Sequence, residues 1–181
     1  MTEGQDRVED DEQLYRRVPN LAPSVYSTEG GQLRFSSTAF NDRSKQPSVN
    51  RAKLQNFDPH RSRFTNMDGV IELNTAKIRA IGPIVQQNNS GSSSHVVNVV
   101  PDPIHGEFSL AIKANPAHAL IVTQPPLTGP SAFKRFKESL AKIATDTGWC
   151  VEPGTSLPRG TFLDILHDAI RWMLGGFWRK K

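Results

Sequence analysis

The sequence has a single cysteine, Cys150, and no long run of apolar residues. One cysteine excludes an internal disulfide, which favours a reducing compartment. No stretch approaches 18 uninterrupted apolar residues, the length that a membrane-spanning helix needs, so membrane insertion is not expected. The first residues are polar and acidic and lack the apolar segment of a secretory signal. Together these absences predict a cytoplasmic protein.

The sequence also lacks a complete catalytic, metal-binding or nucleotide-binding motif. Asp102 and His105 stand close together, but two groups do not make a zinc site. The other histidines without partners at ligand spacing are His60, His95 and His167. We therefore predict no metal and no cofactor.

Charge is distributed unevenly along the chain. The formal net charge is +4, yet residues 1–12 carry six acidic residues and one arginine, and residues 13–65 carry nine Lys or Arg against three acids. The first segment is typical of a flexible acidic leader. The second segment interleaves its arginines with aromatic residues, a composition that also occurs in nucleic-acid-binding surfaces; these aromatics are Tyr15, Tyr26, Phe35, Phe40, Phe57 and Phe64.

Composition divides the remaining chain into three parts. Residues 13–124 contain short apolar runs separated by turn residues and are expected to form the main domain. Within it, the polar stretch QQNNSGSSSH at 86–95 predicts a flexible loop. Three prolines and a glycine at 125–130 predict a joint, and residues 131–181 predict a helical tail.

Several segments of the main domain have the pattern of strands. The best candidates are residues 33–37, 68–73, 95–100 and 118–123, which are β-branched or alternate apolar with polar residues. Residues 74–83 read as one short helix that Asn74 or Thr75 caps and that Gly82 and Pro83 end. Residues 14–18 are too few for periodicity to separate strand from helix. Short strands without regular βαβ alternation predict an α+β fold, a small mixed or antiparallel sheet followed by a C-terminal helical hairpin.

The hairpin is expected from two amphipathic segments. Residues 131–148 begin with Ser131 as a helix cap and carry apolar residues on one stripe. A second helix is expected to begin at Thr161. The apolar side chains that we expect to bind a protein partner are Phe133, Phe136, Leu140, Ile165, Ile170, Trp172, Phe177 and Trp178.

The stretch LRFSSTAFNDRSKQPSV at 33–49 suggests an anion site. Guanidinium groups and hydroxyls match phosphate oxygens, and His118 stands at the start of a strong strand where it could act as acid or base. The expected ligand-binding residues are Arg16, Arg17, Arg34, Ser36, Ser37, Arg43 and Ser48, with Asp42 beside them. This reading predicts that they converge with His118 in one cleft. The alternative is an edge strand and a turn whose serines bond their own backbone.

The motifs LYRRV, RFSSTAF and NPAHALIV over about 13–123 resemble a set of small uncharacterised bacterial proteins. Leu14-Tyr15-Arg16 followed by Ser36-Ser37 also resembles the start of RES-type and other ADP-ribosyltransferase-like domains. That second resemblance implies that an arginine holds dinucleotide phosphates and that Glu72 stabilises a ribosyl cation. The glycine-rich GRW stretch of RES domains is absent.

Three functions therefore stay open. The first is a non-enzymatic component of a larger assembly in a bacterial cytoplasm, bound to a protein partner through residues 131–181. The second is an enzyme or ligand-binding domain for a phosphate-bearing molecule, with His118 and Glu72 as candidate catalytic residues. The third is nucleic-acid binding through residues 13–65.

Overall fold

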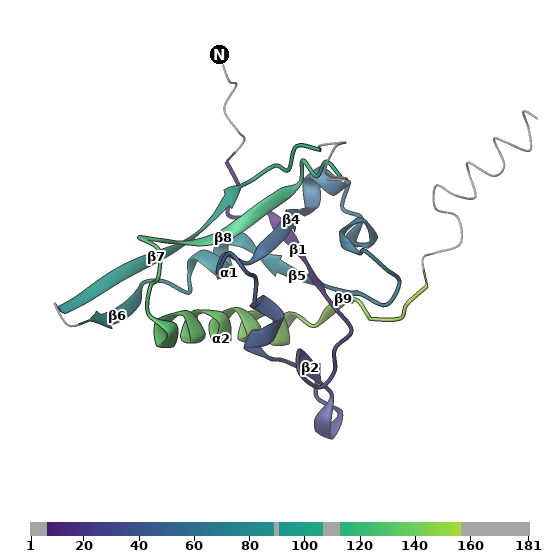
Figure 1. Ribbon diagram of the computed structural model, residues 1–181. Coiled ribbons are helices and arrows are strands. Elements are labelled where there is room, and N and C mark those ends of the chain that lie inside the picture. The colour runs from purple at the N-terminus through teal and green to yellow at the C-terminus, as the bar shows by residue number, and fades with distance from the viewer. Residues whose placement is uncertain (1–6, 89–90, 107–112, 157–181) are drawn as a thin grey trace, which may run out of the picture.

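The computed structural model describes residues 7–88, 91–106 and 113–156 (Figure 1). Their main feature is a seven-stranded antiparallel sheet with the strand order β6-β7-β8-β4-β1-β5-β9. Its strands are β1 (Gln13–Val18), β4 (Ser48–Arg51), β5 (Gly69–Asn74), β6 (Ile84–Asn88), β7 (Gly91–Pro101), β8 (His118–Gln124) and β9 (Trp149–Val151). A separate pair is formed by β2 (Tyr26–Ser27) and β3 (Arg34–Phe35).

The described residues contain few helices. α1 (Thr75–Arg79) is short and α2 (Pro130–Thr147) is long. Four single turns of 3-10 helix complete the description: η1 (Glu29–Gly31), η2 (Ser37–Phe40), η3 (Ala52–Gln55) and η4 (Pro59–Ser62). The fold is thus α+β with an antiparallel sheet, as the pattern of short strands predicted.

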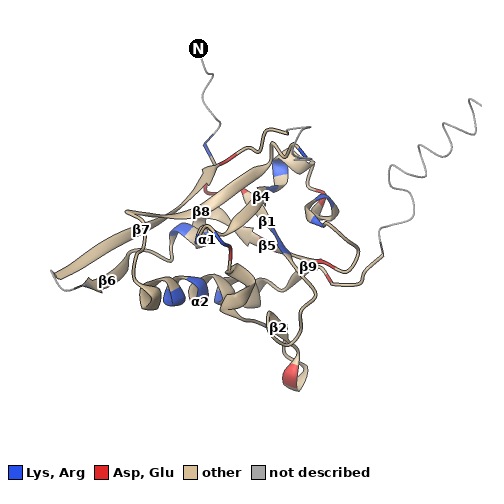
Figure 2. Ribbon diagram, in the orientation of Figure 1, with Lys and Arg blue, Asp and Glu red and all other residues tan. Residues whose placement is uncertain are grey.

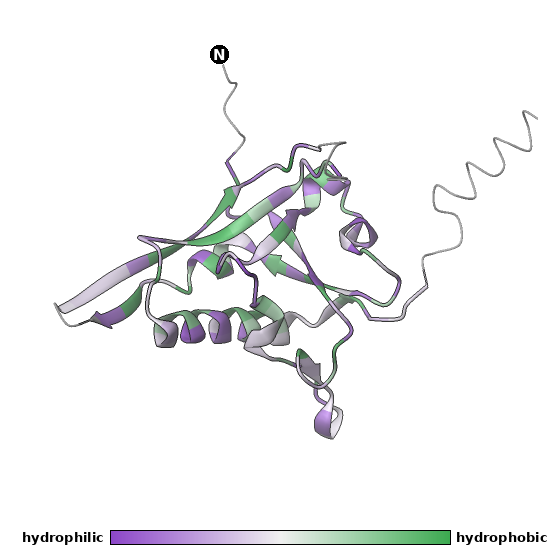
Figure 3. Cartoon of the chain, viewed as in Figure 1, coloured by the Kyte–Doolittle hydropathy of each residue, from purple (hydrophilic) through white to green (hydrophobic). Residues whose placement is uncertain are grey.

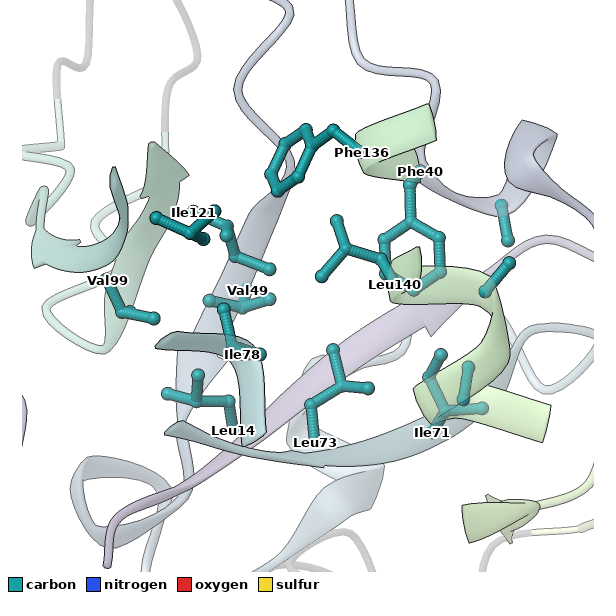
Figure 4. Close-up of a cluster of buried hydrophobic side chains, with 14 of the residues drawn as sticks. Leu14, Phe40, Val49, Ile71, Leu73, Ile78, Val99, Ile121, Phe136 and Leu140 are labelled. Carbon is teal, nitrogen blue, oxygen red and sulfur yellow. The ribbon is translucent and has the colours of Figure 1, made fainter. Parts of the chain in front are cut away.

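α2 covers one face of the sheet and supplies part of the core. Phe136 and Leu140 are buried beside Leu14 of β1, Ile71 of β5 and Ile121 of β8 (Figure 4). The expected boundary at 125–130 therefore does not separate this helix from the domain. Residues 130–147 belong to the domain because their apolar stripe is buried in its core.

The predicted loop at 86–95 is replaced by a hairpin. Residues 84–88 pair in register with residues 91–95, from Ile84 opposite His95 to Asn88 opposite Gly91. The far end of this hairpin is hydrophilic, as Figure 3 shows. The prediction was wrong because one side of this polar ribbon is buried: Gln86 and His95 are 6% and 3% exposed. Gln86 Nε2 donates to Thr128 Oγ1 at 2.7 Å, and His95 Nδ1 lies 2.7 Å from the carbonyl oxygen of Pro125.

The last residues of the expected leader also belong to the domain. Val8 is fully buried, and the backbone carbonyl of Glu12 accepts the N–H of Thr75 at 3.1 Å. Residues 7–12 thereby close the end of the sheet where α1 begins. Residues 1–6 lie outside the described residues.

Most other predicted elements are confirmed. β5, β7 and β8 occupy the three apolar runs expected as strands, and residues 14–18 lie in β1. Asn74 caps α1, its Oδ1 accepting the N–H of Lys77 at 3.1 Å. The strand expected at 33–37 shrinks to β3, because Ser36 caps η2 instead of continuing the strand.

The chain after α2 forms a strand before the described residues end at 156. Gly148, at φ 81°, ends α2, and β9 then pairs with β5. Cys150 on β9 is exposed, although its position between Trp149 and Val151 suggests burial. The second helix of the expected hairpin lies outside the described residues. Among the described helices, none has the length and apolar character to cross a membrane.

Candidate functional site

The part of the site that lies over the sheet is on the face turned away from α2. In β1, Leu14 and Val18 join the core beneath α2, so the alternate residues Tyr15 and Arg17 point to the opposite face. Tyr15 pairs with Asn50 of β4, and Asn50 pairs with His118 of β8. These three residues form one row across the middle of the sheet.

An open cavity of about 710 Å³ lies over this row, a volume that suits a small molecule. η4 and the segments on both sides of residues 107–112 contribute to its walls. Its polar and aromatic lining residues include Tyr15, Arg16, Arg17, Asn41, Asp42, Ser48, Asn50, Gln55, Arg61, Ser62, Arg63, Phe64, Lys113, Asn115 and His118.

A chain of hydrogen bonds between uncharged side chains lies within this lining. Asn115 Nδ2 donates to Asn50 Oδ1 at 2.8 Å, and Asn50 Nδ2 donates to Ser62 Oγ at 3.0 Å. Ser62 Oγ in turn donates to Gln55 Oε1 at 2.6 Å. Because each side chain is bonded to the next, this part of the lining is pre-organised rather than free to rearrange.

His118 is held by Asp102 at the cavity wall. Its Nδ1 lies 2.7 Å from the carbonyl oxygen of Asp102 and 3.1 Å from Asp102 Oδ2. A carbonyl oxygen only accepts, so Nδ1 carries the proton and Nε2 of the neutral ring holds a lone pair. Nε2 has no partner among the described residues and is suited to accept a proton or hydrogen bond from a ligand. The sequence placed Asp102 beside His105, whereas the fold pairs it with His118.

Positive charge dominates the cavity. Five Lys or Arg residues line it against one carboxylate, that of Asp42. Figure 2 shows basic positions on β1 and on both η3 and η4, which flank this end of the sheet. An excess of cations around a small opening attracts anions.

Arg16 is not available as a ligand-binding cation. Its Nη1 and Nη2 both bond to the carboxylate of Asp42, and its Nε and Nη2 donate to the carbonyl oxygen of Ala39. Nη1 also donates to the carbonyl oxygen of Ser48 at 2.7 Å. Arg16 therefore fixes the loop from 39 to 48 against β1, a structural role.

Arg17 is only partly engaged. Its Nη1 lies 3.3 Å from Asp68 Oδ1, and its guanidinium carbon lies 4.0 Å from the centre of the Phe64 ring. A third of the Arg17 side chain, 34%, stays exposed. Arg63 donates to the backbone carbonyls of Thr65 and Asn66, and its Nη1 lies 3.1 Å from His60 Nδ1. It has no carboxylate partner among the described residues.

The structure splits the predicted anion site. Arg17, Ser48 and His118 line the cavity with Arg16, whereas Arg34, Ser36, Ser37 and Arg43 do not. β3, which carries Arg34, packs beside α2, where the backbone N–H of Phe35 bonds to Thr145 Oγ1 at 3.0 Å. The prediction of one cleft for all these residues was wrong, because β3 packs on the α2 side of the sheet and, of η2, only Thr38 and Ala39 line the cavity.

Two of the displaced residues have local roles instead. Ser36 Oγ accepts the N–H of Thr38 and donates to the carbonyl of Ser24 at 2.7 Å, the serine–backbone bonding that the alternative reading described. Arg34 is exposed and bonds only to Gln32, at 3.4 Å, within the described chain.

Glu72 does not meet His118. It pairs with Tyr15 on the side away from β4, so three strand spacings of roughly 4.8 Å separate it from His118.

Burial, with the charges of Cys150, Glu72 and Asp58, raises the pKa of Tyr15 to about 12. The Tyr15 hydroxyl therefore stays protonated, and it donates to the carbonyl of Phe57 at 3.1 Å.

The residues expected to bind a protein partner also divide. Phe136 and Leu140 are buried in the protein's own core, so they are not available to a partner, and Phe133 is partly buried against that core. The remaining five, Ile165, Ile170, Trp172, Phe177 and Trp178, lie outside the described residues. The assembly role stays a prediction that depends on those five.

Comparisons with family models, with curated proteins and with solved structures find no match to this chain. The two resemblances stated from the sequence therefore stay predictions. Among the described residues, no three His, Cys, Asp or Glu side chains form a group that could hold a metal ion.

Sequence reasoning missed several cavity residues. Asn50 and Asn115 carry no motif of their own and become neighbours only through the pairing of β4 with β8 and the bridge between Ile104 and Asn115. Arg61, Arg63 and Phe64 were visible as part of the basic segment that is interleaved with aromatics. That pattern was the one signal that pointed toward this wall of the cavity.

Proposed function

We propose that the protein binds a small phosphate-bearing molecule in the cavity over β1, β4 and β8. The observation that carries this proposal is the excess of lining cations over carboxylates. Arg16 neutralises Asp42, the one acidic lining residue. Of the four other lining cations, Arg17 lies 3.3 Å from Asp68 and Arg61 lies 3.7 Å from Asp58, whereas Arg63 and Lys113 have no carboxylate partner among the described residues. A multiply charged anion satisfies several such cations at once.

The uncharged part of the lining supports the same ligand class. The Asn115, Asn50, Ser62 and Gln55 side chains provide amide and hydroxyl groups that suit sugar or phosphate oxygens. His118 adds a hydrogen-bond acceptor at Nε2. In this proposal Arg17 and Arg63 bind phosphate oxygens, and His118 receives a ligand hydroxyl.

Calorimetric titration with inorganic pyrophosphate tests the proposal. We expect Arg17→Ala and Arg63→Ala each to weaken binding about ten-fold, the effect of losing roughly 1.4 kcal/mol of a charge-assisted contact. Arg34→Ala removes the same charge from an exposed site outside the cavity and should leave affinity unchanged. Thermal denaturation of each variant verifies that it is folded.

Two results would contradict this function. The first is no binding of pyrophosphate by the wild-type protein at low ionic strength. The second is an equal loss of affinity in the Arg34→Ala control, which would indicate diffuse attraction to net charge rather than a site.

A further inference from the structure

Phe64 is an aromatic ring that the fold holds at the cavity wall with most of its surface uncovered. It is 82% exposed, the largest value among the exposed large hydrophobic residues of the described chain. An exposed phenylalanine forgoes the free energy that burial of its side chain would supply. Phe57 is also exposed, at 65%, but does not line the cavity.

The position of the ring is fixed from beneath. The Arg17 guanidinium carbon lies 4.0 Å from the ring centre, a distance typical of a planar cation stacked on an aromatic face. One face of Phe64 is therefore occupied by Arg17, and the ring has its other face available to a ligand.

A single buried carboxylate positions both groups. Asp68 Oδ2 accepts the backbone N–H of Phe64 at 3.0 Å and that of Thr65 at 2.9 Å, while Oδ1 lies 3.3 Å from Arg17 Nη1. The Asp68 side chain is 8% exposed. Because one carboxylate fixes the ring segment and the cation, the stack of Arg17 and Phe64 is pre-organised.

We propose that this stack is a platform for a nucleobase, so that the ligand of the cavity is a nucleoside phosphate. The inference rests on the proposed function and names its ligand class. A flat base stacks on the free face of Phe64 while the phosphate reaches the cations of the same cavity, the combination that binds nucleotides and single strands elsewhere. This platform includes neither Arg16, one of the residues that carried the resemblance to ADP-ribosyltransferase-like domains, nor Glu72, which that resemblance implied as a catalytic residue.

The test compares AMP with ribose 5-phosphate, which has the same sugar and phosphate but no base. In calorimetry, we expect the wild-type protein to bind AMP about ten-fold more tightly or better. Phe64→Ala should lower the affinity for AMP to that for ribose 5-phosphate and leave the latter within about two-fold. Phe64→Leu keeps an apolar side chain without a ring and should behave like the alanine variant.

Phe64→Trp is the control variant that keeps an aromatic ring at this position. It should retain the affinity for AMP, and the fluorescence of the added indole should be quenched when a base stacks on it. Phe64 is so exposed that all three variants are expected to keep the thermal stability of the wild type.

Two sources of the ligand are distinguished by a third probe, a short single-stranded oligoadenylate. Binding much tighter than that of AMP, with a steep dependence on salt, would assign the platform to nucleic acid. Equal affinity would assign it to free nucleotides. Equal affinities of the wild type for AMP and ribose 5-phosphate would overturn the platform while leaving phosphate binding intact, whereas binding of neither would overturn both.

Discussion

Glu12 and Arg51 form a buried ion pair at the end of the sheet, the clearest case in which single side chains hold distant segments together. Arg51 Nε donates to Glu12 Oε1 at 2.7 Å, and both side chains are 4% exposed. Lys53 Nζ lies 3.2 Å from Glu12 Oε2. Burial raises the pKa of Glu12, but the hydrogen bonds and charges of Arg51 and Lys53 outweigh burial, and the net pKa lies below its ordinary value.

We expect Glu12→Gln to lower the free energy of unfolding at pH 7 by about 3 kcal/mol, because it leaves the Arg51 guanidinium buried beside a neutral amide. A carboxyl whose pKa is lowered by folding stabilises the protein above its unfolded pKa, and this stabilisation is lost as the pH falls through the folded pKa. The difference between wild type and variant should therefore be complete at pH 7 and should shrink below about pH 4.5.

Urea denaturation at a series of pH values measures this difference. Glu29→Gln, in the exposed turn η1, is the matched control and should change stability by less than about 0.5 kcal/mol. A difference that persists undiminished in acid would show that the loss comes from packing rather than from ionisation.

The limits of prediction are also visible in neighbouring residues. Arg16 and Arg17 are adjacent and chemically identical in the sequence, yet Arg16 is saturated by Asp42, Ala39 and Ser48, whereas Arg17 lies under Phe64. Side chains alternate between the two faces of a strand, so which arginine is held by the loop from 39 to 48 and which lies under Phe64 depends on which face α2 covers. No pattern within residues 14–18 contains that information.

At the scale of elements, α2 shows that amphipathicity predicts a helix and its apolar stripe but not the surface that the stripe meets. Its apolar stripe was predicted, but Ser131 is not its cap: the helix begins at Pro130 with Gly129 as the N-cap, and Gly148 ends it. The prolines before it indicated a separate tail, yet the chain turns back and the helix lies across the sheet (Figure 1). Prolines interrupt regular structure, but they do not determine where the next element goes.

Two phenylalanines on α2 provide a test of this placement. Phe136 is 1% exposed in the core, whereas Phe133 is only partly buried. We expect Phe136→Ala to lower the free energy of unfolding by about 3–5 kcal/mol, since it leaves a cavity among packed side chains. Phe133→Ala should lower it by clearly less, about 1–2 kcal/mol.

Urea denaturation of the two variants side by side checks the difference. Comparable small losses in both would mean that α2 does not supply the core of the sheet and that the stripe is held by something else.

At the scale of the whole molecule, the described domain runs from residue 7 to residue 156, because β9 follows α2 and pairs with β5. We expect removal of residues 131–181 to abolish cooperative unfolding, since it deletes Phe136, Leu140 and the edge strand β9 together. Removal of residues 157–181 alone deletes no described core residue and should leave a cooperative thermal transition.

Circular dichroism during heating distinguishes the two truncated chains. A shorter variant, ending at 130, that unfolds as cooperatively as the one ending at 156 would restore the boundary expected from the prolines. The truncated chain that ends at 156 also tests the assembly prediction. If it no longer binds a partner that the full chain binds, that partner is bound through residues 157–181.

The alternation of β1 ties the cavity to the core in a single six-residue strand. Leu14 and Val18 are fully buried under α2, and between them Tyr15 and Arg17 reach the opposite side. If the pairing of β1 with β4 or β5 shifted by one residue, Leu14 and Val18 would point into the cavity and Tyr15 and Arg17 into the core. The correct register of β1 is therefore required both for the core beneath α2 and for the lining of the cavity.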